Sequence, residues 1–254
     1  MLEVHILASG SDGNCTVIQY DDEAIMIDAG ISCARARKLM DLEGVDEHCI
    51  KALMVTHEHA DHIQGVGPIS RKMNLPVYCN PATIGSFNPG NVDYHMTQTL
   101  QEFQVGNFNI TPLPTLHDAA DPCAYTVTAG DSRVLIATDT GKFTVPLRDA
   151  LQKSDFAIVE ANYDNKMLIE GPYPEPLKRR IAGTYGHMCN LDSAKEIKDT
   201  AVNPDRKIFL GHLSKHNNTP DIARDTVAEC TGIKRFKIDC LEFFGDTRTV
   251  TVSR

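Results

Sequence analysis

Six residues in the first quarter of the chain, 57–62 with the sequence HEHADH, constrain its fold and chemistry more than any other segment. They contain four good metal ligands and follow the apolar run 52–55, which predicts a buried strand ending at Thr56. No cysteine lies among the four, and imidazole together with carboxylate suits Zn, Mn or Fe rather than a closed structural zinc site. The segment therefore predicts a metal centre on a loop directly after a strand.

The spacing within this segment predicts two binding positions. Successive side chains of an extended chain point to opposite faces, so His57 and His59 point the same way and can bind one ion. Asp61 and His62 lie one turn later and can face a second ion. We therefore expect two divalent metal ions as cofactor, either Zn or Mn, with Fe as a further option.

A two-metal site needs about three more ligands than this segment supplies. His117, Asp139 and His212 each directly follow an apolar run that predicts a strand. Loops just past strands are held by a rigid sheet and still face solvent, which suits catalytic groups. Each residue alone is typical of a surface group, but their shared context makes them candidate ligands together.

Length and composition predict an ordinary globular protein. The chain has 254 residues, of which 42% are hydrophobic and 23% charged, so we expect a single domain over 1–254. No apolar run could cross a bilayer, and the N-terminus predicts a first strand rather than a signal peptide. We therefore expect a cytoplasmic protein without a membrane partner. The eight cysteines are scattered without a C-x-x-C pair, which predicts reduced thiols.

The charge leaves the substrate open. A formal net charge of −9 argues against indiscriminate binding to nucleic acid. Bound divalent metals would nevertheless add positive charge where a phosphate must approach. Basic clusters occur at 35–38, 178–180 and 234–237, and each is more typical of a solvated face than of a binding patch.

Apolar runs alternate with amphipathic segments in both halves of the chain. Strands are predicted at 4–8, 15–20, 24–27, 52–55, 76–79, 108–113, 124–128, 134–138, 156–160 and 207–210, with two more in the tail 234–254. Helices are predicted at 32–42 with Ser32 as cap, at 63–73, from Pro81, at 145–152, at 190–201 with Asn190 or Asp192 as cap, and from Thr219. Residues 171–176 are predicted to form a stiff loop. This order predicts an α/β sandwich with helices outside and sheets within.

Several motifs together resemble the metallo-β-lactamase superfamily. Its motifs occur in order along residues 1–213, at Asp28, 57–62, His117, Asp139 and His212. Finer segments resemble one branch, the YycJ (WalJ) family of bacterial metallohydrolases, which is associated with exonuclease activity on DNA. These segments are SGSDGN at 9–14, GHMCNLDSA at 186–194 and LGHLSKHNN at 210–218.

The resemblance implies a four-layer αββα fold with the site at the edge of the two sheets. It implies that His57, His59 and His117 hold one metal. Asp61, His62 and His212 would hold the other, with Asp139 bridging both and Asp28 orienting a ligand histidine through a hydrogen bond. Ser9 and Asn14 would lie in a loop near the site, and weaker expectations place Asn162 and Asn217 among substrate-binding residues.

His187 is the position that best separates substrate classes. It matches a histidine that nucleic-acid-processing members of the superfamily place over the scissile phosphate, and which lactamase-type members lack. An imidazole outside the metal shell can stabilise developing charge or protonate a leaving oxygen. The alternative is a histidine that only caps or packs against the following helix.

The chain departs from the superfamily's nucleases in two respects. The interval between Asp139 and His187 is too short for the inserted β-CASP domain of larger nucleases, so we expect no such insertion. Tyr163 stands where the related motif has histidine, which leaves the supporting role of Tyr163 open. The role of His216 is open as well.

The leading hypothesis is two-metal hydrolysis of a phosphodiester, most specifically a 5′-to-3′ DNA exonuclease acting on duplex DNA, with Asp61 and His187 as catalytic residues. The alternatives are a phosphodiesterase acting on a small cyclic phosphate and a metal-binding regulatory protein without turnover. Acyl substrates do not call for His187, so lactamase and thioesterase activities fit less well.

Overall fold

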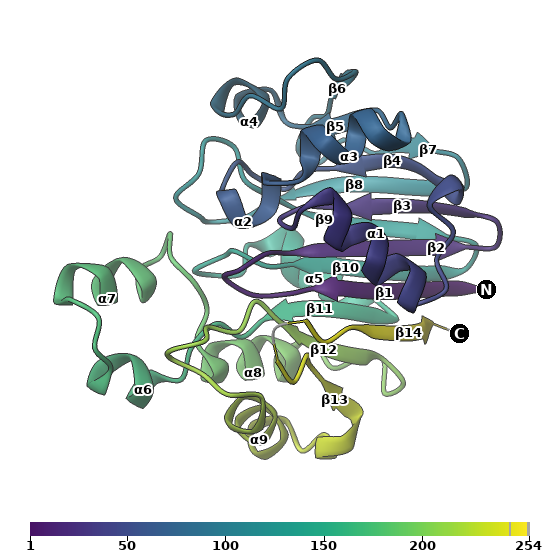
Figure 1. Cartoon of the computed structure of the whole chain (residues 1–254). Coiled ribbons are helices and arrows are strands. Elements are labelled where there is room, and N and C mark those ends of the chain that lie inside the picture. Colours follow the sequence, from purple (N-terminus) through teal and green to yellow (C-terminus); the bar gives the residue numbers. More distant parts are fainter. Residues whose placement is uncertain (244, 253–254) are drawn as a thin grey trace.

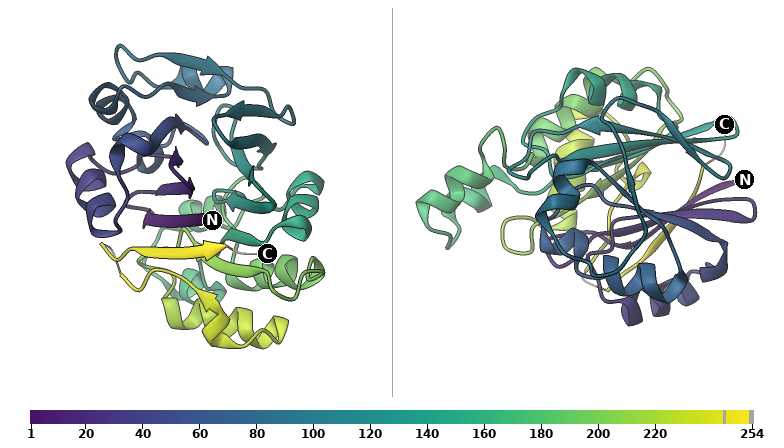
Figure 2. Two further views of the ribbon diagram at one scale, coloured as in Figure 1. Left: turned by 90° about the vertical axis from the view of Figure 1, so that its right-hand side faces the viewer. Right: turned by 90° about the horizontal axis from the view of Figure 1, so that it is seen from above.

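Two seven-stranded β-sheets pack face to face, and helices cover the outer face of each (Figures 1 and 2). This computed structural model describes residues 1–243 and 245–252. The N-terminus and the end of β14 (Arg248–Val252) lie at one end of the sheets, and an arm formed by α6 (Asn165–Glu170) and α7 (Glu175–Ile181) projects from the other end (Figure 1). The predicted α/β, four-layer αββα sandwich is confirmed.

The first sheet combines an antiparallel N-terminal meander with a parallel half. The pairs β1–β2 and β2–β3 are antiparallel, whereas β3, β4, β5 and β6 run parallel. Its strands in spatial order are β14 (Arg248–Val252), β1 (Leu2–Ala8), β2 (Cys15–Tyr20), β3 (Glu23–Ile27), β4 (Ile50–Met54), β5 (Val77–Cys79) and β6 (Tyr94–Met96). Helices α1 (Cys33–Leu42) and α3 (Val66–Met73) connect its strands, together with the short η1 (Glu47–Cys49), α2 (Ala60–Ile63) and α4 (Pro81–Ser86).

The second sheet is antiparallel on one side and parallel on the other. The strands β10, β11, β12 and β13 run parallel, so their carboxyl ends meet at one edge. The spatial order is β13 (Ile238–Asp239), β12 (Lys207–Gly211), β11 (Phe156–Glu160), β10 (Ser132–Ala137), β9 (Cys123–Ala129), β8 (Phe108–Pro114) and β7 (Phe103–Val105). Its outer face is covered by α5 (Val145–Lys153), α8 (Asn190–Asp199) and α9 (Pro220–Thr231).

Three layers of buried apolar side chains account for the continuous apolar runs in the sequence. On β2, Ile18 packs in the layer between the two sheets, while its neighbour Val17 packs against the helices outside. Aromatic side chains such as Phe108 and Tyr125 fill the central layer. Strands buried on both faces read as continuous hydrophobic segments rather than as an alternating pattern.

Two local predictions near the metal-ligand segment and α8 were wrong in detail. The helix predicted at 63–73 is broken between α2 and α3, because Gly65 packs so closely against the Ile31 carbonyl that a Cβ there would collide with it. The cap of α8 is Cys189, whose sulfur accepts a hydrogen bond from the backbone nitrogen of Asp192. A thiol cap has no strong sequence signal, since Ser, Thr, Asp and Asn dominate this position.

Two other segments also differ from the prediction. Residues 171–176 are not all loop, since α7 (Glu175–Ile181) begins within them and forms an arm with α6 (Asn165–Glu170). The tail supplies the two predicted strands, but β13 and β14 join different sheets and a 3₁₀ turn (Arg235–Lys237) precedes them. Residues 244, 253 and 254 of that prediction lie outside the described residues.

Two findings bear on expectations from composition. All eight cysteines are free thiols, and Cys15, Cys79, Cys123, Cys189 and Cys240 are buried, as expected for reduced core residues. Within the part of the chain that the structure describes, no helix combines the length and apolar character needed to span a bilayer.

A buried pair of asparagines fastens the helices to the second sheet beneath its carboxyl edge. Asn218 and Asn190 exchange amide hydrogen bonds of 2.8 and 3.0 Å, and Asn218 also donates to the Ala161 carbonyl oxygen at 2.8 Å. Its Oδ1 accepts a further bond from the Thr219 backbone nitrogen at the start of α9. One side chain thereby joins the end of β11 to two helices.

Replacing this amide should destabilise the protein. Asn218→Ala leaves the buried Asn190 amide and the Ala161 carbonyl without partners, so the free energy of unfolding should fall by about 1–3 kcal/mol. Urea denaturation followed by circular dichroism measures the change. The exposed Asn91→Ala control should shift the free energy of unfolding by less than about 0.5 kcal/mol. Equal stability of both variants would contradict the fastening role.

Candidate metal centre

Five strand ends deliver polar side chains to one edge of the sandwich. Asp139, Glu160 and His212 lie at the carboxyl ends of the parallel strands β10, β11 and β12, and the first sheet brings Asp28 and His57 from the ends of β3 and β4. This edge faces the side of α2 and the α6–α7 arm (Figure 1).

The backbone turns sharply at three of these positions. Asp28, Asp139 and His212 have φ values of 58°, 53° and 56°, in the left-handed region that non-glycine residues rarely adopt. Such conformations persist where the surrounding structure imposes them, and they cluster at functional sites. Here they turn the chain immediately after a strand.

The first ligand group consists of three histidines. The ligand nitrogens of His57, His59 and His117 lie within 4.8 Å of one another. Nδ1 of His117 lies 3.0 Å from the Gly186 carbonyl oxygen, which fixes the tautomer and leaves Nε2 facing His59 at 3.2 Å. The group is the one that the resemblance assigned to a single metal.

The second ligand group joins the two sheets. Ligand atoms of Asp61, His62, Asp139 and His212 also lie within 4.8 Å of one another. Nε2 of His212 lies 3.2 Å from Asp61 Oδ2, and Nε2 of His62 lies 3.1 Å from Asp139 Oδ2. Asp139 reaches the first group as well, with its Oδ1 3.6 Å from His117 Nε2. Its position between the groups is the one expected of a bridging ligand.

Two buried polar atoms are incompletely paired at this junction. Nε2 of His57 makes no hydrogen bond although the residue is 1% exposed, and Oδ2 of Asp139, in a residue that is 3% exposed, faces His62 Nε2 at 3.1 Å without the geometry of a hydrogen bond. Incomplete pairing of a buried polar atom costs free energy, so the two atoms are suited to a cation between the groups. The residues present therefore fit divalent metal ions, and their nitrogen and oxygen donors suit Zn, Mn or Fe.

Protonation in the two groups follows from burial and from close charges. Burial raises the pKa of Asp139, but His212 and His62 beside it hold that pKa well below its usual range, so the carboxylate is ionised. Burial lowers the pKa of His57, as does His62, which keeps the imidazole neutral. Against the effect of burial, the carboxylates Asp139 and Asp28 raise the pKa of His62. A metal ion at His62 competes with that proton, so metal binding releases protons.

Asp28 orients His62 from behind, as the resemblance implied. Its Oδ2 lies 2.7 Å from His62 Nδ1, and its Oδ1 accepts a 2.8 Å hydrogen bond from the Thr56 backbone nitrogen. The Thr56 hydroxyl donates to the same carboxylate at 2.9 Å and lies 3.0 Å from His57 Nδ1. Because Nδ1 of His62 is engaged, Nε2 is the nitrogen available to a metal.

Glu160, the fully buried carboxylate at the centre of this edge, was not among the site residues predicted from the sequence. Its Oε1 lies 2.8 Å from His187 Nδ1 and 2.9 Å from His212 Nδ1. Its Oε2 accepts backbone hydrogen bonds from Thr140 at 3.0 Å and Met188 at 3.2 Å. Burial raises its pKa, but the His187 and His212 contacts lower it more, and the pKa falls to about 2. The available signal was an acidic residue ending an apolar strand, the same signal that identified Asp139.

His187 lies beside both ligand groups without belonging to the histidine triad. Its ring centroid is 5.0 Å from that of His117 and 5.1 Å from that of His212, and its side chain is 19% exposed. Glu160 engages Nδ1, which leaves Nε2 as the nitrogen able to meet a bound molecule. The side chain therefore does more than pack against α8.

The four expected substrate-binding residues lie close to the centre but mostly behind it. Asn14 is 6% exposed; its side-chain amide exchanges hydrogen bonds with the Gly10 backbone, and its Nδ2 also lies 3.0 Å from His62 Nε2. Asn162 is buried and donates to the His212 carbonyl oxygen at 2.9 Å, while Asn217 is fully buried beside Ser214. Ser9 accepts a bond from the His212 backbone nitrogen at 2.9 Å. Because the three asparagines are buried, they are poorly placed to contact a large substrate. They instead support the loops around the ligand groups.

Two residues whose roles were open lie off the centre. Tyr163 is 5% exposed and packs with Leu168 and Cys189 where the arm begins. His216 lies against Tyr173, with ring centroids 5.8 Å apart. Both contribute to the base of the α6–α7 arm rather than to either ligand group.

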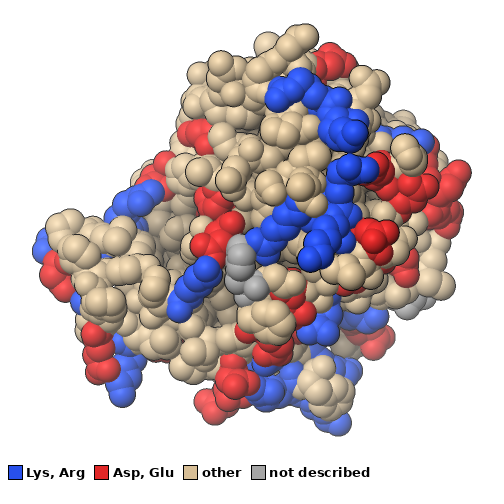
Figure 3. Space-filling view, viewed as in Figure 1, with Lys and Arg blue, Asp and Glu red and all other residues tan. Residues whose placement is uncertain are grey.

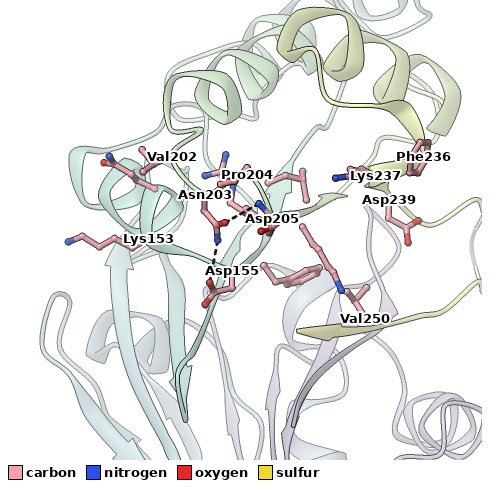
Figure 4. A pocket seen from close by; sticks show the side chains of 15 residues that line it. Lys153, Asp155, Val202, Asn203, Pro204, Asp205, Phe236, Lys237, Asp239 and Val250 are labelled. Atoms are coloured by element: carbon pink, nitrogen blue, oxygen red, sulfur yellow. Dashed lines mark hydrogen bonds between the residues drawn. The ribbon is translucent and has the colours of Figure 1, made fainter. Parts of the chain in front are cut away.

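A cavity of about 1050 Å³ lies away from the ligand groups. It opens where β11 and β12 begin, between the segment before β12 and the tail, and its lining includes Lys153, Phe156, Phe236 and Val250 (Figure 4). None of its lining residues is a candidate ligand, so the chemistry belongs to the opposite end of these strands.

Comparison with known proteins identifies the family. The model of the Beta-lactamase superfamily domain matches residues 23–212, which contain all seven candidate ligands. The chain belongs to the metallo-β-lactamase superfamily. Its curated relatives include proteins named as exodeoxyribonucleases and ribonucleases, which are hydrolases, and the two ligand groups lie at the sheet edge that the resemblance had implied.

Relatives within the superfamily confirm the resemblance to the YycJ (WalJ) branch. The chain is 32% identical over 247 residues to the exodeoxyribonuclease YycJ of Bacillus anthracis, covering 93% of this chain and 92% of that protein. It is 33% identical over 229 residues to the exodeoxyribonuclease WalJ of Streptococcus pneumoniae, covering 87% and 85% of the two chains. The solved metallo-β-lactamase fold protein YhfI of Bacillus subtilis aligns with a TM-score of 0.76 at 20% identity, over 98% of this chain and 99% of that one.

Weakening the support of His62 should weaken metal binding. Asp28→Asn removes the charge behind Nδ1, so the affinity for Zn should fall about 10- to 100-fold. Titration against a competing chromogenic chelator measures this affinity. Asp93→Asn is the matched control, because Asp93 contacts His95 at 3.1 Å in an exposed pair elsewhere. An Asp28→Asn protein that binds Zn as tightly as the control would rule out the orienting role.

Proposed function

We propose that this protein is a two-metal phosphodiesterase that degrades DNA, most specifically as a 5′-to-3′ exonuclease on duplex DNA. The observation that carries the proposal is His187, fixed 2.8 Å from the buried Glu160 carboxylate and adjacent to both ligand groups. A phosphodiester needs a proton donor or charge acceptor at its leaving oxygen, whereas the ligand groups alone would suffice for many acyl substrates. The similarity to the exodeoxyribonucleases YycJ and WalJ supports DNA as the substrate.

Each group has a role that its position suggests. We assign His57, His59 and His117 to one metal, Asp61, His62 and His212 to the other, and Asp139 to both. The two ions, when bound, would lower the pKa of water and neutralise charge on the phosphate oxygens.

The protein's own side chains carry out the proton transfers of the proposed reaction. Asp61, the most exposed carboxylate of its group with 24% of its side chain accessible, accepts the proton of the attacking water. His187 donates from Nε2 to the leaving oxygen, because Glu160 occupies Nδ1. Glu160 contacts both His187 and His212, so it holds the proton donor at a fixed position relative to one metal ligand.

The distribution of charge supports a polyanionic substrate despite the formal net charge of −9. Lys and Arg side chains gather in a band across the face that carries α1 and α3 (Figure 3). The exposed basic residues of these helices are Arg37, Lys38, Arg71 and Lys72. Glu47 partly offsets the band through its 2.5 Å pair with Arg37. A band of this kind can follow a phosphate backbone.

The proposal extends to the whole chain as one domain and to a cytoplasmic location, both of which stay predictions. Two other functions use the same residues. A phosphodiesterase for a small cyclic phosphate would need the same histidine, and cleavage of such a compound without cleavage of DNA would identify it. A regulatory metal-binding protein would hold two ions per chain and hydrolyse no phosphodiester.

A digestion assay separates these functions. A 5′-phosphorylated duplex and its single-stranded counterpart are incubated with the protein in Mn and in Zn, and products are resolved on a sequencing gel. A 5′-to-3′ exonuclease should release nucleotides progressively from the phosphorylated end of the duplex. Release from the 3′ end, or internal cuts alone, would reject that polarity.

Removal of His187 should separate chemistry from metal binding. The His187→Ala protein should retain two metal ions by elemental analysis, because all seven assigned ligands remain, but its kcat on DNA should fall about 10²- to 10⁴-fold. His95→Ala is the control, since His95 is an exposed histidine far from the ligand groups. Unchanged kcat in His187→Ala would eliminate the assigned role.

A further inference from the structure

An exposed aromatic side chain stands next to the proton donor. Tyr185 is 60% exposed, two residues before His187, and no hydrogen bond or ring contact engages it within the described part of the chain. Two residues of chain span at most about 7 Å, so its backbone is a near neighbour of the proposed reaction centre.

The loop that carries Tyr185 is fastened on both sides. On the metal side, the Gly186 carbonyl oxygen contacts His117 Nδ1 at 3.0 Å. On the arm side, the His187 backbone nitrogen donates to the Ile181 carbonyl oxygen at 2.8 Å. Gly186 packs so tightly on the end of α7 that a Cβ there would collide with the Ile181 carbonyl.

A second contact fixes the same loop against the turn after Asp139. A Cβ at Gly141 would collide with the Thr184 carbonyl oxygen, so the two backbones touch directly. Nearby, Arg180 at the end of α7 pairs with Asp118 at 2.5 Å, and Asp118 directly follows the candidate ligand His117. The backbone on both sides of Tyr185 is thus fixed against the loops that carry His117 and Asp139.

The depth of the centre constrains how DNA can reach it. His57, His62, His117, Asp139 and His212 are each at most 5% exposed. A scissile phosphate therefore has to reach ligands that are largely buried. Unstacking of the terminal nucleotides would ease that approach, and it exposes the flat faces of their bases.

We propose that Tyr185 stacks on a base at the end of the DNA strand being cleaved and thereby favours DNA over small phosphodiesters. This inference rests on the proposed nuclease function. Stacking on an aromatic residue tolerates any base sequence, because every base has a π-face. Tyr185 is accordingly a substrate-binding residue, and the rigid loop couples the position of the base to that of His187.

The test removes the ring and the base separately. Wild-type and Tyr185→Ala proteins are assayed on a 5′-phosphorylated duplex and on the same duplex with abasic residues at its two terminal 5′ positions. On intact DNA, kcat/KM should fall about 10- to 100-fold in Tyr185→Ala. On abasic DNA, the two proteins should agree within about threefold, since no base remains to stack. Tyr185→Phe, which keeps the ring, should retain the dependence on the terminal base.

The control is Phe236→Ala, an 80% exposed aromatic residue in the tail, which should behave as wild type on both duplexes. An equal loss for Tyr185→Ala on intact and abasic DNA would overturn the stacking proposal and indicate a structural effect of the substitution. No loss on intact DNA would overturn it as well.

A binding measurement distinguishes failure of this inference from failure of the proposed function. The natural chain contains no Trp, so Tyr185→Trp introduces a single tryptophan whose fluorescence reports stacking. Quenching by intact but not by abasic DNA supports stacking even if the protein cleaves no DNA. Active cleavage without base-dependent quenching, by contrast, leaves the nuclease function standing and refutes stacking.

Discussion

The buried carboxylates at the sheet edge are the constraint on which the rest of the structure depends. Asp28, Asp139 and Glu160 are each at most 3% exposed, and an ionised carboxylate at that depth costs several kcal/mol unless it is paired. Every one of them contacts a histidine of the centre, and Asp28 and Glu160 also accept backbone hydrogen bonds. The buried carboxylates are therefore stable only together with their histidine partners. As a result, the fold rather than flexible loops determines the ligand geometry.

The sheet topology makes this set possible. Parallel strands deliver their carboxyl ends to one edge, so Asp139, Glu160 and His212 become neighbours although they are far apart in sequence. The left-handed backbone at Asp139 and His212 is unfavourable in isolation, and the strand ladders before these residues hold it in place. The hydrogen bonds of the parallel strands thus offset the conformational cost of the turns that orient the ligands.

The sequence predicted most where the chemistry is local or tied to a motif. His57, His59, Asp61 and His62 lie within six residues, and strand ends marked by apolar runs located Asp139 and His212. Glu160 was missed because its importance comes from two partners that only the folded chain brings to it.

Other features that were not predicted from the sequence also have physical explanations. The break at Gly65 depends on the distant Ile31 carbonyl, and no helical pattern contains that contact. Asn162 and Asn217 were expected among substrate-binding residues, and a sequence pattern does not reveal that both are buried. Exposure also separates Tyr185 from the neighbouring motif residues, and a sequence pattern alone gives no reason to select it.

In the proposed mechanism, the loop from Ile181 to His187 would give the metal centre its preference for one substrate. The two ligand groups by themselves suit hydrolysis of many bonds, since their task is to bind metal. The loop carries His187, which contacts Glu160, and the exposed Tyr185, and its Gly186 carbonyl oxygen contacts the candidate ligand His117. A change in this loop can therefore alter which substrates are cleaved while the metal ligands stay in place. Metal binding and substrate preference are separable in this proposal, because the metal ligands follow strands whereas Tyr185 and His187 lie on the loop between α7 and α8.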